Sequence, residues 1–123
     1  MKDPNDSFFI GRIKSLKFAI RGVLLLITTE HSIMVQFSIA ILVTILGFVM
    51  DISAIEWMFQ LLAIGMVLVA ESLNTGIEKL SDFIHPDYHK RIGFIKDISA
   101  GAATFAAIIA FIIGLIIYIP KFS

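Results

Sequence analysis

The sequence predicts an all-α membrane protein, with one N-terminal amphipathic helix in the membrane interface and three transmembrane helices. Hydrophobic residues make up 58% of the 123 residues and charged residues only 16%, against about 25% charged in an ordinary soluble domain. The mean hydropathy is +0.92. Three apolar segments are long enough to cross a bilayer core, which requires about 20 residues. Composition and segment length therefore point to the same class.

Length and charge limit the possible functions further. The length suits a single domain over residues 1–123. The net charge is zero, with ten basic and ten acidic residues, so we expect no nucleic-acid partner. The absence of cysteine excludes disulfides, thiolate metal sites and cysteine nucleophiles.

The first predicted element is a helix over about residues 7–29. Apolar residues recur at steps of three and four, while basic residues line another face, which is typical of a helix lying in the membrane interface. The apolar set is Phe9, Ile13, Leu16, Ile20 and Leu24, and the basic set is Lys14, Lys17 and Arg21. This helix is either a basic anchor that enforces topology or a segment that also binds a polyphosphate.

The three spans follow at about residues 33–50, 55–84 and 98–119. Only a few residues after Asp51 connect the first two spans, so these must form an antiparallel hairpin. His85-Pro86 ends the second helix, because proline disfavours helical geometry in the residue before it. We expect Pro120 to stop the third.

The distribution of lysine and arginine predicts the orientation. Five basic residues precede the first span and four lie between the second and third, whereas the first hairpin loop has none. By the positive-inside rule, the N-terminus and the second loop are cytoplasmic and the C-terminus lies outside.

The polar end of the second span is the strongest functional signal. Glu71 ends the apolar run from Ile55 to Ala70, which is interrupted by Glu56 and Gln60. A charge costs roughly 2.5–3.5 kcal/mol at the centre of a bilayer and less near its edge, so a carboxylate in a span is a candidate functional residue.

Three more polar residues share the face of Glu71. At 100° per residue, Glu78 and Asp82 lie about 20° to either side of Glu71, and Asn74 lies about 60° away. Glu71 and Glu78 are about 10 Å apart along the axis, which suits two separate tasks. Asp82 is also compatible with simple solvation.

Two further positions carry candidate residues. Glu30 precedes the first span and is either a boundary residue or a partner of Glu78 in holding Mg²⁺ through carboxylates. Lys96 and Asp97 open the third span. They are either a basic anchor and an N-cap, or a lysine on a phosphate and an aspartate that positions a polar ligand group.

These residues resemble the signatures of a known family. The stretch ESLNTGIEKLSD, from Glu71 to Asp82, resembles the ExxNTAIExxxD signature of the small bacterial diacylglycerol kinases and undecaprenol kinases. The stretch KDISAGAA, from Lys96, is similar to their KDxxAGAV element. The resemblance implies a homotrimer in the bacterial inner membrane, with active sites shared between subunits, that moves the γ-phosphoryl group of ATP onto a lipid hydroxyl.

The resemblance also implies roles for individual residues. Glu71 corresponds to the catalytic base, and Glu30 and Glu78 correspond to ligands of Mg²⁺. Residues at positions that contact the nucleotide or line the active site are Arg12, Asn74, Glu78, Asp87, Tyr88, His89, Lys96 and Asp97.

Two alternatives stay open on the sequence alone. A non-enzymatic scaffold, or a subunit that relays ions or protons, would use Glu71 but would give no role to Glu30 or Lys96. Within the kinase interpretation, the acceptor is either diacylglycerol or undecaprenol, because apolar lipid contacts do not separate the two.

Overall fold

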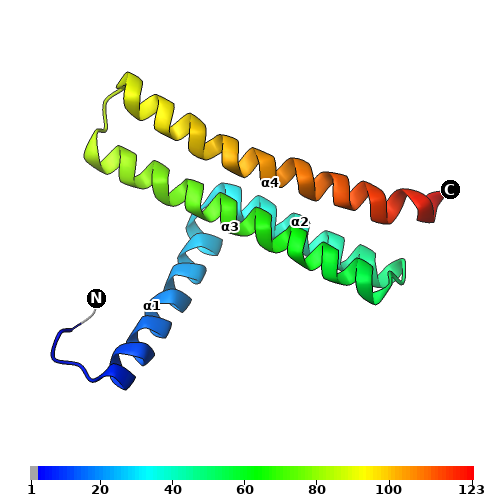
Figure 1. Ribbon diagram of the computed structural model, residues 1–123, viewed down its shortest axis with the longest axis horizontal. Coiled ribbons are helices and arrows are strands. Elements are labelled where there is room, and N and C mark those ends of the chain that lie inside the picture. The colour runs from blue at the N-terminus through cyan, green and yellow to red at the C-terminus, as the bar shows by residue number, and fades with distance from the viewer. Residues whose placement is uncertain (1–2) are drawn as a thin grey trace.

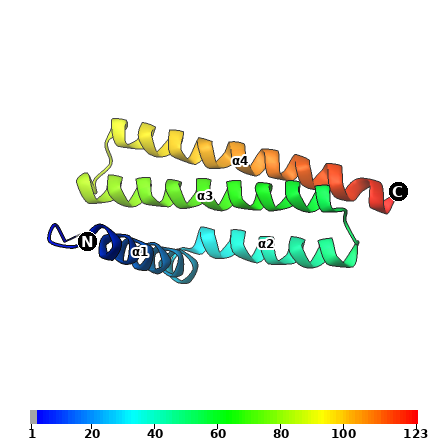
Figure 2. The same cartoon turned by 60° about the horizontal axis from the view of Figure 1, so that its bottom comes forward.

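The computed structural model describes residues 3–123, and the described part of the chain forms four α-helices (Figure 1). Their bounds are α1 Phe8–Thr29, α2 His31–Val49, α3 Ala54–Ile84 and α4 Lys90–Phe122. The helices α2, α3 and α4 run side by side, and α3 lies between the other two (Figure 2). Helix α3 packs mainly against α4 and less extensively against α2.

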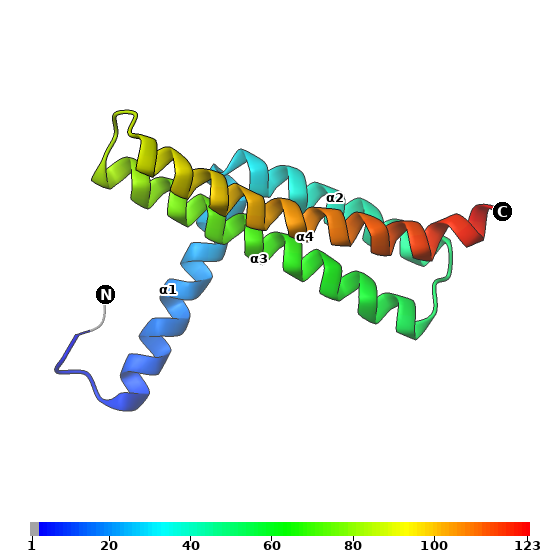
Figure 3. The ribbon, with the colours of Figure 1, turned by 45° about the horizontal axis from the view of Figure 1, so that its top comes forward.

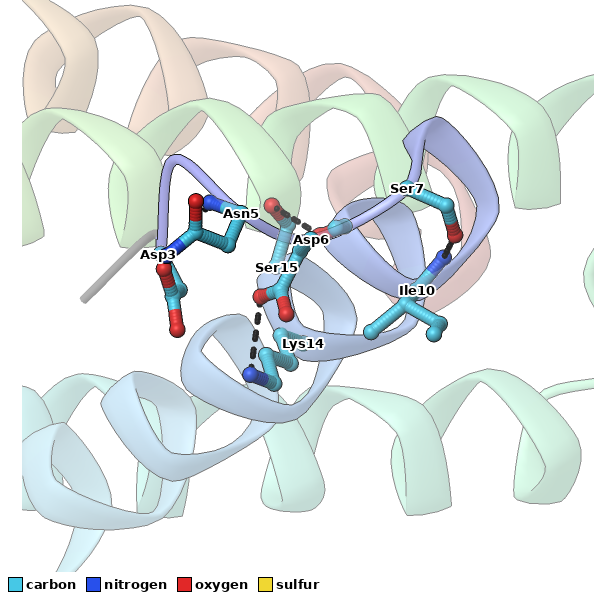
Figure 4. Close-up of polar contacts among 8 residues, drawn as sticks. Asp3, Asn5, Asp6, Ser7, Ile10, Lys14 and Ser15 are labelled. Carbon is cyan, nitrogen blue, oxygen red and sulfur yellow. Dashed lines mark hydrogen bonds and ion pairs between the residues drawn. The ribbon is translucent and has the colours of Figure 1, made fainter.

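Helix α1 leaves this bundle at a steep angle and contacts it through α2 (Figures 1 and 3). Ser7 caps its start, with Oγ accepting a hydrogen bond from the backbone N–H of Ile10 (Figure 4). The Lys14 ammonium lies 2.8 Å from the Asp6 carboxylate and ties the preceding turn to the helix. The chain turns into α2 at Glu30, whose φ of −104° and ψ of 113° are extended.

The connection from α2 to α3 is a tight turn with a specific hydrogen-bond pattern. The N–H of Ile52 donates to the carbonyl of Gly47, and the N–H of Asp51 donates to that of Phe48. This is a Schellman motif, which usually places glycine at the left-handed position. Here Asp51 occupies it, with φ of 52°. Ser53 then opens α3 with a capping box completed by Glu56.

The start of α4 differs from the prediction. The helix begins at Lys90, eight residues before the predicted position 98. The N-cap is His89, whose Nδ1 accepts from the backbone N–H of Arg91. The prediction that Asp97 caps this helix was therefore wrong, because Asp97 already lies inside α4. Pro120 does not stop the helix either, and α4 continues to Phe122.

Three of the four helices suit a membrane. Helices α2, α3 and α4 are each long and apolar enough to cross one, and most of their apolar side chains face outward. The packed core is small and centres on Ile52, Ile117 and Tyr118. Such an exposed apolar exterior is what a bilayer requires, and the chain is a multi-pass integral membrane protein.

Candidate functional site

The polar end of the bundle consists of the break at Glu30, the last turns of α3 and the first turns of α4. On α3, Glu71, Asn74 and Glu78 follow one another along one stripe, as the helical spacing predicted. Asn74 Nδ2 donates to Glu78 Oε1 over 3.4 Å. Oε2 of Glu71 and Oδ1 of Asn74 are buried and have no hydrogen-bond partner among residues 3–123. An unsatisfied buried polar atom is costly and rare, so this pair calls for a partner from outside the chain.

The break between α1 and α2 brings a second carboxylate to this end. Glu30 Oε1 lies 2.9 Å from Nζ of Lys79, the residue that directly follows Glu78 on α3. The Glu30 side chain is mostly buried, whereas Lys79 is largely exposed. Glu30 therefore lies at the level of Glu78, and its carboxylate is paired there with an exposed lysine.

Helix α4 contributes an ion pair across the same end. Nζ of Lys96 contacts Oδ1 of Asp82 on α3. Asp82 is thus not merely a solvated carboxylate, although its side chain stays exposed. The pair lies eleven residues beyond Glu71, which is about 16 Å along α3. Within one chain, Lys96 is therefore nearer to Glu78 than to Glu71.

The loop between α3 and α4 carries three of the predicted nucleotide contacts. His85 Nδ1 lies 2.7 Å from the carbonyl of Asp87, and His89 caps α4, so the loop is held by short local contacts. The Tyr88 side chain is 87% exposed. Asp97 is also exposed, on the first part of α4. These groups surround the polar end without touching Glu71.

The structure does not bring Arg12 to the polar end. It lies on the first turns of α1, eighteen residues before Glu30, which is about 27 Å along that helix. Helix α1 leads away from the bundle (Figure 1), and Arg12 is exposed in the single chain.

The oxygen atoms at the polar end suit a hard cation only in part. Within residues 3–123, no group of three or more histidine, aspartate or glutamate side chains is placed to hold a metal ion. Glu30 and Glu78 come from two different elements and offer carboxylate oxygens at one level. Mg²⁺ is commonly bound by one or two carboxylates together with substrate phosphates, so this donor set fits Mg²⁺ that arrives with a nucleotide.

Two partners at the site were missed by the sequence reasoning. Lys79 pairs with Glu30 and Asp82 pairs with Lys96. Each pair joins residues from different helices, so no local spacing reveals it. Lys79 and Asp82 both lie in the stretch from Glu71 to Asp82, and this was the only sign in the sequence that they belong to the site.

Comparison with known proteins identifies the family of the chain. The family model described as prokaryotic diacylglycerol kinase matches residues 17–118. The undecaprenol kinase of Bacillus subtilis (strain 168) is 40% identical over 108 residues, which cover 88% of each chain. The diacylglycerol kinase of Escherichia coli (strain K12) is 26% identical, also over 88% of each chain. The chain therefore belongs to the prokaryotic diacylglycerol kinase family.

Proposed function

We propose that this chain transfers the γ-phosphoryl group of ATP to the hydroxyl of a membrane lipid alcohol, with Glu71 as the catalytic base. Family membership makes it a lipid kinase. The assignment of the site rests on one observation: within residues 3–123, the buried Oε2 of Glu71 lacks a hydrogen-bond partner, at the point where the apolar run of the membrane-length helix α3 ends. A lipid hydroxyl arriving from the bilayer would donate to this atom.

The proposed reaction needs little covalent chemistry from the protein. The lipid oxygen forms a bond to the γ-phosphorus, the bond to the bridging oxygen of ADP breaks, and the hydroxyl proton passes to Glu71. Asn74 orients Glu78 through its amide and leaves its own Oδ1 for a donor on the substrate. Lys96 offsets charge on the nucleotide phosphates while Asp82 orients it.

Glu30 and Glu78 would hold Mg²⁺, which neutralises charge on the phosphates when it is bound. For this, the carboxylate of Glu30 must leave Lys79 or share it. Asp87, Tyr88 and His89 would contact the nucleotide from the exposed loop, and Asp97 would do so from α4.

The single chain leaves the site incomplete, which supports a homotrimer with sites shared between subunits. Glu71 and Asn74 keep unpaired buried oxygens, and Arg12 is about 27 Å from Glu30 along α1. A second copy could bring Arg12 to the nucleotide and cover α3. In the same proposal, α1 lies in the interface of the bacterial inner membrane, exposing Phe8, Phe9 and Leu16 to lipid. The distribution of basic residues supports a cytoplasmic location for the polar end.

The acceptor is proposed to be a polyprenol, and diacylglycerol is the second candidate. The identity of 40% to the undecaprenol kinase, against 26% to the diacylglycerol kinase, favours this order. A scaffold or proton-relay role is not favoured, because both relatives are named as kinases.

The test is phosphate transfer from radiolabelled ATP in mixed micelles with Mg²⁺. Undecaprenol and diacylglycerol are offered separately, and Glu71→Gln serves as the inactive control. Label that enters one lipid, and is lost in Glu71→Gln, supports the proposal and identifies the acceptor. Folded protein that labels neither lipid would refute the proposed acceptors.

A further inference from the structure

A groove with a volume of about 440 Å³ runs between α2, α3 and α4, inside the part of the bundle that is long and apolar enough to cross a membrane. Its lining is apolar except for Gln36 on α2 and Gln60 on α3. Among the described residues, no charged side chain lines it. An uncharged groove in this position suits a hydrocarbon chain.

The groove leads toward the proposed catalytic base. On α3 it is lined by Gln60, Ile64 and Val67, which at 100° per residue lie within about 40° of the direction of Glu71. Leu68, the last lining residue on α3, precedes Glu71 by three residues, or about 4.5 Å along the axis. A lipid whose hydroxyl meets Glu71 therefore has its chain directed along this stripe.

The far end of the groove is closed by hydrogen bonds among three helices. Gln60 is 4% exposed. Its Oε1 accepts from the Tyr118 hydroxyl over 2.5 Å, and its Nε2 donates to the carbonyl of Val43 over 3.2 Å. Ile117, which also lines the groove, packs there with Ile52 and Tyr118 in the core. Breaking these hydrogen bonds would leave polar groups unpaired in an apolar region, which costs free energy. This end of the groove is therefore expected to stay closed.

The length and position of the groove indicate its occupant. Glu71 and Gln60 are separated by eleven residues, about 16 Å along the axis, which is half of a bilayer core about 30 Å thick. On α3 the lining itself runs from Gln60 to Leu68, about 12 Å along the axis. An uncharged groove of this length matches the first part of an extended hydrocarbon chain.

We propose that the hydrocarbon chain of the lipid alcohol lies in this groove and that the Gln60–Tyr118 hydrogen bond ends it at the depth of one leaflet. This inference rests on the proposed function, in which Glu71 binds the lipid hydroxyl. Chain carbons beyond Gln60 leave sideways into the bilayer. The enclosed segment therefore has the same length for an acyl chain and for a much longer polyprenyl chain. The groove distinguishes between lipid alcohols only by the shape of this first segment.

Gly114 gives a direct way to block the groove. It lines the groove on α4, and a Cβ added there meets no atom within 4 Å. The pairs Lys96–Asp82 and Tyr118–Gln60 set the register of the antiparallel helices, so Gly114 lies beside Ile64. That level is seven residues from Glu71, or about 10 Å.

The experiment compares Gly114→Phe with Ile112→Phe. Both variants carry a new phenylalanine on α4, but Ile112 is an exposed residue outside the groove. Lipid alcohols with chains shorter and longer than about 10 Å are assayed as acceptors. Gly114→Phe should lower kcat/KM about 5- to 150-fold for the long acceptors, which corresponds to overpacking by about 1–3 kcal/mol. It should leave the short acceptors and the KM for ATP unchanged, and Ile112→Phe should resemble wild type throughout.

Equal behaviour of the two variants at every chain length would overturn the inference, and so would a loss of oligomer in Gly114→Phe alone. A wild-type protein that phosphorylates no lipid alcohol would instead refute the proposed function. If Gly114→Phe does not fold, the wild-type protein is cross-linked to lipid alcohols carrying a diazirine at defined carbons. Labels on Val67 near the hydroxyl and on Gln60 about 10 Å deeper support the groove, and labels confined to outward faces contradict it.

Discussion

Glu30 and Lys79 join the break between α1 and α2 to the last turns of α3, with Oε1 and Nζ 2.9 Å apart. The pair has two possible meanings. It is either a structural tie between helices, or a resting contact of a carboxylate whose working partner is a metal ion. The two meanings predict different consequences for removing each partner.

If Glu30 is a metal ligand, Glu30→Gln should raise the Mg²⁺ concentration for half-maximal activity about 10- to 150-fold. This factor corresponds to the loss of one contact of a charged group, which is worth about 1.5–3 kcal/mol. Lys79→Met should change it little, because a largely exposed ion pair contributes no more than about 1 kcal/mol. Magnesium titrations of activity at saturating ATP measure both. Equal effects of the two variants would mean that the Glu30–Lys79 pair only connects the helices and that Glu30 does not bind the metal ion.

Lys96 and Asp82 give a parallel prediction for the nucleotide. Lys96→Met should lower kcat/KM for ATP about 10- to 150-fold through loss of a phosphate contact. Asp82→Asn should lower it about fivefold at most, since it removes only an exposed ion-pair partner. Steady-state kinetics with varied ATP separate them. An inactive Asp82→Asn would show that Asp82 itself contacts the reactants.

Glu71→Gln should reduce turnover about 10²- to 10⁴-fold, the usual contribution of a general base. The amide keeps the shape and can still accept a hydrogen bond, so binding of Mg·ATP should remain, as measured by calorimetry. The matched control is Glu56→Gln, in the first turn of α3, where the carboxylate pairs with Lys121. It should turn over like wild type. Retained turnover in Glu71→Gln would exclude Glu71 as the base.

The residues explain why the sequence predicted some features and missed others. The end of α3 at His85-Pro86 was confirmed, because proline acts on its immediate neighbour. The start of α4 was missed, since Lys90 to Lys96 are too polar to read as a span but still helical. The contact of Gln60 with Tyr118 joins residues 58 positions apart, so it depends on the packing of α3 against α4. Helical periodicity was enough to predict that Glu71, Asn74 and Glu78 share one stripe. The contacts of this region with other helices could be found only from the tertiary fold.

The turn between α2 and α3 offers a test of the fold that is independent of activity. A Cβ at Gly47 would lie 2.7 Å from the far edge of the Trp57 indole and 3.1 Å from Ile52. The indole also packs against Phe48, with ring centroids 4.8 Å apart, so it has little freedom to shift.

Gly47→Ala should therefore destabilise the protein by about 1–3 kcal/mol, as overpacking does. Gly76→Ala is the matched control, because a Cβ there meets no atom within 4 Å. It should be neutral or stabilising by up to about 1 kcal/mol, since alanine favours a helix over glycine. Thermal unfolding in one detergent measures both variants against wild type. Equal Tm values for the two variants would mean that α2 and α3 do not approach each other at Gly47 and Trp57 as described.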